Sequence, residues 1–224
     1  MENFFNISAF SIISLLCFIP AIVIHEVSHG YVAYRLGDPT AKSKGRITLN
    51  PLAHVDPFGT VILPLVLMFT GGPVIGYAKP VPYNPGYFKN IRKGEFLTGI
   101  AGPASNIIMA ALGAIIGRII IFLFLPSPTS AIPDWIFVIC YCFTMVNLCL
   151  AFFNLIPLPP LDGSSIIAVF LSDNALRQYY RIQRYALPIL LILIFVLPMI
   201  VGVNLITMYL DATVGTILTL VFGI

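Results

Sequence analysis

Long apolar segments separated by short polar ones make up most of the chain. The first runs from residue 8 to about residue 35, and its stretch from Phe10 to Ile24 contains no charged side chain. A second runs from Glu95 to about Leu125, and a third begins at Ile136. A helix of about 20 apolar residues spans the hydrocarbon core of a bilayer. The pattern therefore predicts several membrane-spanning helices.

The third apolar segment is interrupted before it is complete. Three prolines lie between residues 157 and 160, and an apolar run from Ser164 to Leu171 follows them. Because proline removes a backbone donor and clashes with the preceding turn, we expect the helix to break inside the membrane. Residues 187–201 are expected to cross the membrane again. Asp211 leaves open whether residues 204–224 form a last span or lie along the surface.

Residues 57–88 do not fit this pattern. They contain an apolar stretch from Thr60 to Thr70, then Gly71-Gly72-Pro73, and basic residues lie on both sides of the whole region. Two full spans need about 40 residues, so we expect a re-entrant element, helical or strand-like, that lines a cavity. The run from Gly76 to Val81 could present the edge of a strand there.

The composition supports a membrane protein. Of the 224 residues, 58% are hydrophobic and only 9% are charged, whereas soluble domains carry about 25% charged residues. We therefore expect an α-helical polytopic membrane protein with about five to six hydrophobic elements and a re-entrant or short β region near its functional site. The length suits a single domain over residues 1–224, with a core at 8–172 and C-terminal helices at 185–224.

The basic residues indicate how the chain is oriented. Eleven of the twelve fall into three groups: Arg35, Lys42, Lys44 and Arg46; Lys79, Lys89, Arg92 and Lys93; and Arg177, Arg181 and Arg184. The positive-inside rule places these groups in the cytoplasm. We therefore expect a multi-pass protein of the cell membrane whose N-terminus lies outside. No basic run is dense enough to indicate nucleic-acid binding.

The strongest chemical signal lies near the end of the first predicted helix, at His25-Glu26-Val27-Ser28-His29. Positions i and i+4 of a helix lie about 40° apart, so His25 and His29 can reach one metal ion. Glu26 lies on a neighbouring face, from which it can take a proton from water. Three ionisable groups beside such an apolar run are unfavourable in lipid unless a metal or polar cavity receives them. The pattern predicts a zinc site inside the membrane; a chance match at a helix end is the alternative.

A catalytic zinc needs a third protein ligand, and Asp162 is the main candidate. It follows the proline-broken segment and has apolar sequence on both sides, where an unpaired carboxylate is unfavourable. Its alternative role is to cap the helix that begins at Ser164. Asn154 has donors that could hold a substrate carbonyl or oxyanion, but a hydrogen bond between packed helices is nearly as plausible.

His54 and Asp56 form the main competing pair. They could form hydrogen bonds to a residue that binds the metal, or they could order the turn region in which they lie. We favour the ordering of the loop.

Three motifs resemble the site-2 protease family of intramembrane zinc metalloproteases. They are His25-Glu26-Val27-Ser28-His29, Gly99-Ile100-Ala101-Gly102-Pro103, and Asn154-Leu155-Ile156-Pro157 followed by Leu161-Asp162-Gly163. The motifs occur in the family's order, and the resemblance covers roughly residues 8–172. Many relatives carry an inserted PDZ domain or an appended nucleotide-binding domain. The predicted helices leave room for neither in these residues, so we expect a minimal catalytic core.

The resemblance implies one Zn²⁺ per chain with His25, His29 and Asp162 as ligands. It further implies that Glu26 is the catalytic acid and base, and that Asn154 stabilises the substrate or oxyanion. Strands beside the active site would hold an unwound substrate segment. The expected partners are a transmembrane protein or peptide substrate and the lipid bilayer.

The function expected from this sequence is zinc-dependent hydrolysis of peptide bonds within or next to the transmembrane helices of membrane-protein substrates, as in regulated intramembrane proteolysis. The site would lie toward the cytoplasmic side. The alternative is a non-proteolytic membrane transporter or scaffold that uses the same residues to bind metal. Glu26 distinguishes the two, because a simple metal-binding site does not need a carboxylate placed beside water.

Overall fold

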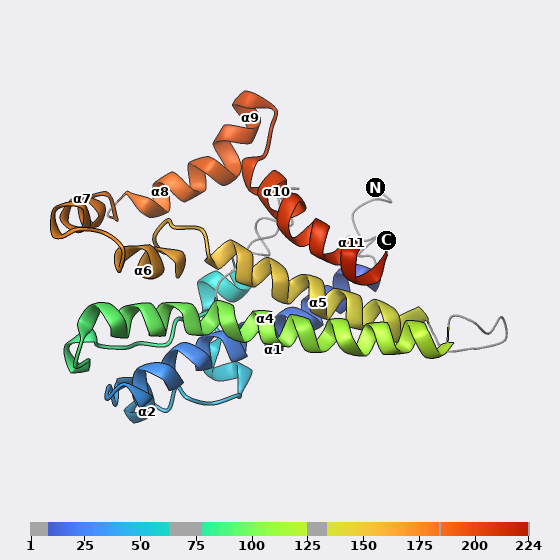
Figure 1. The fold of residues 1–224 in the computed structure, drawn as a ribbon, viewed down its shortest axis with the longest axis horizontal. Helices are drawn as coiled ribbons and strands as arrows, with labels where there is room; N and C mark the ends of the chain where they lie inside the picture. The colour runs from blue at the N-terminus through green and yellow to red at the C-terminus, as the bar shows by residue number, and fades with distance from the viewer. Residues whose placement is uncertain (1–8, 63–77, 125–133, 184, 224) are drawn as a thin grey trace.

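Three long helices form the centre of the structure, a computed structural model that describes residues 9–62, 78–124, 134–183 and 185–223 (Figure 1). They are α1 (Ala9–Arg35), α4 (Ile91–Phe124) and α5 (Asp134–Asn154). Each of the three packs against both of the others. The long apolar runs of the sequence therefore fold as helices that bury their polar side chains against one another.

Shorter elements surround this centre. Between α1 and α4 along the chain come α2 (Thr40–Ser43), the 3-10 helix η1 (Pro51–His54), the π-helical segment η2 (Pro57–Ile62) and the 3-10 helix η3 (Pro85–Tyr87). After α5 come α6 (Gly163–Ala168), α7 (Asp173–Gln183), α8 (Ala186–Leu191), the π-helical η4 (Ile192–Val196) and α9 (Leu197–Val201). The chain ends in α10 (Leu205–Leu210), the π-helical η5 (Asp211–Gly215) and α11 (Thr216–Phe222), which return along α5 (Figure 1).

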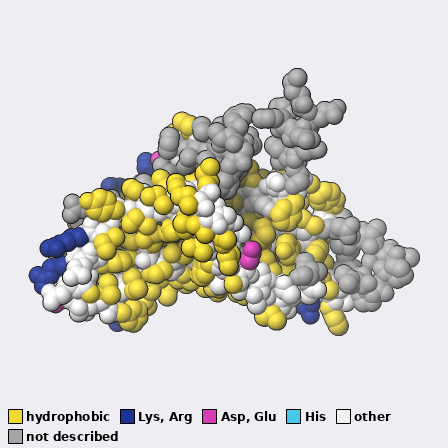
Figure 2. Space-filling model, turned by 90° about the horizontal axis from the view of Figure 1, so that it is seen from above, with side chains coloured by type: hydrophobic (Ala, Val, Ile, Leu, Met, Phe, Trp, Pro, Cys, Tyr) yellow, Lys and Arg dark blue, Asp and Glu magenta, His cyan; other side chains and the backbone are white. Residues whose placement is uncertain are grey.

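Within the described residues, four helical segments are long and apolar enough to cross a membrane. They are Ala9–Arg35, Ile91–Leu123, Trp135–Asn154 and Leu205–Phe222. The three helices predicted from the sequence are thus confirmed as helices of spanning length, and the C-terminal segment joins them. Pro188–Val201 is apolar but shorter, and its crossing stays a prediction. Figure 2 shows apolar side chains over most of one face, with Lys and Arg gathered mainly at one end.

The start of α4 differs from the prediction. The helix begins at Ile91, ahead of the predicted start at Glu95. The Asn90 side chain accepts a hydrogen bond from the backbone N–H of Lys93 at 3.0 Å. An asparagine that accepts from the third residue of a helix is an N-cap, and it stabilises one additional helical turn.

The break in the third apolar segment is confirmed. The helix α5 ends at Asn154, turns occupy the proline-rich residues, and α6 begins at Gly163. Since α6 packs against α4, the broken segment folds back over the central helices.

The predicted re-entrant or β region stays a prediction. Its middle, residues 63–77, lies outside the described residues, and the described ranges contain no strand. Residues 78–84 are irregular and lie beside the end of α1, because Asp38 accepts a hydrogen bond from the backbone N–H of Asn84 at 2.6 Å. Burial raises the pKa of the Asp38 carboxyl, but hydrogen bonds from Thr40 and Asn84 outweigh burial and bring the pKa below its usual value. A charged carboxylate therefore ties this segment to the turn that follows α1.

Candidate metal centre

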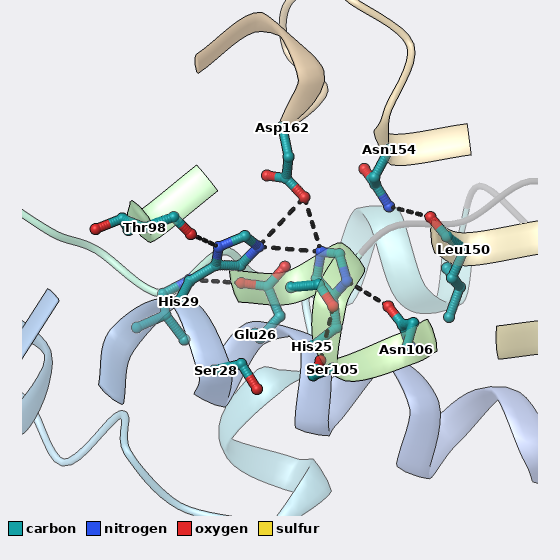
Figure 3. A network of polar contacts seen from close by, with 12 residues as sticks. His25, Glu26, Ser28, His29, Thr98, Ser105, Asn106, Leu150, Asn154 and Asp162 are labelled. Carbon is teal, nitrogen blue, oxygen red and sulfur yellow. Dashed lines mark hydrogen bonds and ion pairs between the residues drawn. The ribbon is translucent and has the colours of Figure 1, made fainter. Parts of the chain in front are cut away.

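The two histidines of α1 and one aspartate from the α5–α6 turn meet at a single point (Figure 3). The Nε2 atoms of His25 and His29 lie 3.1 Å apart. The Oδ2 atom of Asp162 lies 3.0 Å from His25 Nε2 and 3.3 Å from His29 Nε2. Both histidines are buried, with 3% and 8% of their surface exposed. The structure thus brings together the three residues that the sequence suggested as ligands.

The opposite ring nitrogens are held by acceptors. His25 Nδ1 lies 2.6 Å from Asn106 Oδ1, and His29 Nδ1 lies 2.6 Å from the backbone oxygen of Thr98. An oxygen acceptor requires Nδ1 to carry the proton, so each neutral imidazole directs the lone pair of Nε2 inward. This is the tautomer that metal-binding histidines adopt when a neighbouring oxygen orients them.

The orientation of the Asn106 amide follows from its own partners. Its Nδ2 donates to the backbone oxygen of Ala21 at 3.2 Å and to Asn147 Oδ1 at 2.8 Å. Asn147 in turn donates to the backbone oxygen of Phe143 at 2.8 Å. With both N–H groups of Asn106 engaged, its oxygen faces His25. A chain of buried amides across α1, α4 and α5 therefore sets the tautomer of His25.

The three facing side-chain atoms suit a metal ion. Two imidazole lone pairs and a carboxylate oxygen face one another, and Asp162 Oδ2 is buried without a hydrogen-bond donor. Such a cluster of acceptors is unfavourable without a cation between them. Among the described residues, His25, His29 and Asp162 form a group that could hold a metal. Two histidines and one carboxylate leave an open fourth position, as in catalytic zinc sites.

A glycine of α4 makes room for these rings. A Cβ atom at Gly102 would collide with Nε2 of His29 and would lie 2.6 Å from Nε2 of His25. Only glycine allows α4 to approach the histidines this closely. The Gly99–Pro103 motif of the sequence thus forms the wall of the site opposite α1.

Glu26 lies beside the histidine rings (Figure 3). Its Oε2 accepts a hydrogen bond from the backbone N–H of Val81 at 2.8 Å. The carboxylate is therefore oriented by the segment that follows the undescribed residues 63–77.

Other sequence candidates lie elsewhere or remain untested. Asn154 at the end of α5 donates to the backbone oxygen of Leu150 at 3.0 Å, and its predicted catalytic role stays a prediction. His54 Nε2 lies 2.9 Å from the backbone oxygen of Thr48, while Asp56 accepts from the N–H of Gly59 at 2.7 Å. These contacts order the loop, as expected for this pair.

The residues that orient the histidines were not predicted from the sequence. Asn106 and Asn147 are fully buried within apolar helices. An uncharged amide inside an apolar run needs a partner, and this is a signal that the sequence offered. The partner itself depends on how α1, α4 and α5 pack, which the sequence did not reveal.

Comparison with known proteins agrees with this geometry. The model of peptidase family M50 matches residues 115–197, which include Asn154 and Asp162. YwhC of Bacillus subtilis, a protein named as a zinc metalloprotease, is 38% identical over 188 residues, which cover 81% of this chain and 78% of YwhC. Rip2 of Mycobacterium tuberculosis, which carries the same description, is 28% identical and covers 81% of this chain and 66% of Rip2. No solved structure matches the chain. The chain belongs to peptidase family M50, the site-2 proteases.

Proposed function

We propose that this protein is a zinc-dependent intramembrane protease that cleaves peptide bonds within or next to transmembrane helices of membrane-protein substrates. The observation that carries the proposal is the convergence of three buried acceptor atoms, from His25, His29 and Asp162, next to the Glu26 carboxylate. A metal transporter would need the three ligands but not Glu26.

In this proposal His25, His29 and Asp162 hold one zinc ion per chain. The zinc, when bound, supplies Lewis-acid activation of water and of the scissile carbonyl. Asn106 and Thr98 keep the proton on Nδ1 of each histidine, so that Nε2 stays available as a ligand. The burial of His25 and His29 strengthens their electrostatic contacts.

Glu26 carries the proton transfers. Its Oε2 is bonded to the N–H of Val81, which leaves Oε1 to accept a proton from the attacking water. The same oxygen then delivers the proton to the leaving amine. We assign to Asn154 the binding of the substrate carbonyl, because one of its N–H groups bonds Leu150 and the second remains for a substrate oxygen.

A helical substrate hides its carbonyls in hydrogen bonds, so it must unwind before cleavage. Glycine or proline near the scissile bond reduces the free energy of unwinding. We therefore propose single-span helices with such residues as the preferred substrates.

The test uses purified protein in detergent. We expect one zinc per chain by elemental analysis and cleavage of at least some members of a panel of single-span substrates. A zinc chelator should abolish cleavage, and added zinc should restore it. Stoichiometric zinc with no cleavage of any substrate would favour the metal-binding scaffold or transporter.

A further inference from the structure

Residues 79–81 lie against α1 at the level of Glu26, and their backbone is bonded on several sides. The N–H of Lys79 donates to the backbone oxygen of His54 at 2.8 Å. The N–H of Val81 donates to Glu26 Oε2 at 2.8 Å. Arg46 Nη2 donates to the backbone oxygen of Lys79 at 2.6 Å and contacts that of Pro80 at 3.4 Å. Four backbone groups in three residues are thus taken up within the chain.

The sequence around Val81 leaves one donor for Glu26. Val81 lies between Pro80 and Pro82, neither of which has an N–H group. The Val81 side chain is buried against α1, and a Cβ atom at Gly30 would lie 2.6 Å from its Cγ1. The single N–H of residues 80–82 is therefore directed at the carboxylate that we assign to proton transfer.

Arg46 is an unusual residue to find in this place. Only 8% of its surface is exposed, and its Nε has no hydrogen-bond partner. Within the described residues its guanidinium forms no ion pair with a carboxylate. A buried cation is unfavourable unless its hydrogen bonds compensate for the lost water. Here those bonds go to the carbonyls of Lys79 and Pro80.

We propose that Arg46 is a positioning residue for Glu26. By holding the carbonyls of Lys79 and Pro80, it fixes the direction of the Val81 N–H, which binds Oε2 and thereby directs Oε1 toward the substrate water. A carboxylate held by one oxygen keeps a single orientation, whereas a free one rotates about its terminal torsion. The inference rests on the proposed proteolytic function, because it concerns the same carboxylate.

The first test compares Arg46→Gln and Arg46→Lys with the wild type in zinc content, kcat and KM on one single-span substrate. Misplacement of a catalytic group by about 1 Å reduces rates by roughly 10²-fold. We expect Arg46→Gln to lower kcat by one to two orders of magnitude on that basis, with zinc content and KM unchanged. Arg46→Lys should restore kcat in part, since its ammonium reaches one carbonyl. Arg35→Gln is the matched control, because Arg35 is exposed and its guanidinium donates to the hydroxyl of Tyr31, one turn away on α1.

Val81 offers a second pair of variants, should Arg46→Gln fail to fold. Val81→Pro removes the N–H that binds Glu26, whereas Val81→Ala keeps it and removes only packing. We expect Val81→Pro to lower kcat as Arg46→Gln does, and Val81→Ala to stay close to the wild type. Equal kcat for Val81→Pro and the wild type would overturn the proposal. So would a loss of zinc in parallel with kcat, which would place the effect on the metal ligands.

A measurement without catalysis separates this inference from the proposed function. In zinc-free protein, hydrogen exchange of the peptide around Val81 reports few amides, because Pro80 and Pro82 contribute none. We expect exchange at Val81 to become faster in both Glu26→Ala and Arg46→Gln. Unchanged exchange in both variants would overturn the positioning role. If exchange at Val81 is slow in the wild type and faster in both variants, but the wild type cleaves no substrate, the proteolytic function alone is overturned.

Discussion

His25 and His29 meet because their spacing of four residues places both side chains on one face of α1. Each ring is then fixed from behind by an oxygen of α4, which sets the tautomer that binds metal. Asp162 completes the set from a turn far along the chain. The site is therefore built from one local motif on α1 and from parts of two other segments, α4 and the turn before α6.

The ligand assignment predicts a clear difference between two aspartates. Asp162→Ala removes one of the three proposed ligands and should greatly reduce the zinc content of the purified protein. Asp56→Ala should leave zinc content close to that of the wild type, since Asp56 accepts a hydrogen bond from Gly59 in the loop. Elemental analysis of both variants tests this assignment. The reverse pattern would move the third ligand to the loop.

At the scale of residues, the sequence predicted the site residues whose chemistry is unusual for their surroundings. His25, His29 and Asp162 are ionisable groups in apolar segments, so each signals a partner. The contact of Glu26 with the N–H of Val81 was not predictable, nor was that of His29 with the backbone oxygen of Thr98, because both involve backbone groups. A backbone N–H or C=O carries no signal in the sequence.

At the scale of elements, α4 determines the width of the site. Gly102 brings its backbone against the histidine rings, while Asn106 one turn later holds His25. A larger side chain at residue 102 has no free space to occupy. The same helix thus limits the site sterically and orients His25, one of the proposed ligands.

Gly102→Ala is therefore expected to displace one histidine ring or push α4 away from α1. Either change should lower zinc affinity, and we expect a loss of about tenfold or more, as for other residues that support metal ligands. Competition with a chromophoric chelator measures this affinity. Gly215→Ala is the control, because a Cβ atom at Gly215 meets no other atom within 4 Å. Equal zinc affinity in Gly102→Ala and the wild type would contradict the close approach of α4.

Element boundaries were predictable where a strong local signal existed. Three prolines ended α5 as expected, and the apolar runs gave the spanning helices. The start of α4 was missed because Asn90 caps a turn of polar residues, and hydrophobic patterning does not report on such a turn. The packing of residues 79–81 against α1 was also missed, since Arg46 and His54 hold them from other parts of the chain.

At the scale of the whole molecule, the apolar surface and the four helices of spanning length in the described part of the chain indicate a membrane protein (Figure 2). Its orientation is a prediction from the basic residues. Arg177 and Arg181 lie on α7, so the positive-inside rule places this helix in the cytoplasm. One more crossing by residues 187–201 would bring Val203 to the outside.

Two single-cysteine additions test this orientation in intact cells. A membrane-impermeant thiol reagent should label Val203→Cys from outside, whereas Asn174→Cys should react only after the cells are opened. Both positions are exposed in the structure. The wild type serves as the control for its four native cysteines, three of which are buried. Labelling of Asn174→Cys in intact cells would reverse the predicted topology.

We propose that one site combines metal ligands with a separate proton carrier. Glu26→Gln separates the two roles, because the amide keeps the size of the side chain but cannot accept a proton from water. Zinc content and cleavage of a single-span substrate are measured on the same purified sample. We expect one zinc per chain and loss of nearly all cleavage. Cleavage at the wild-type rate in Glu26→Gln would contradict it.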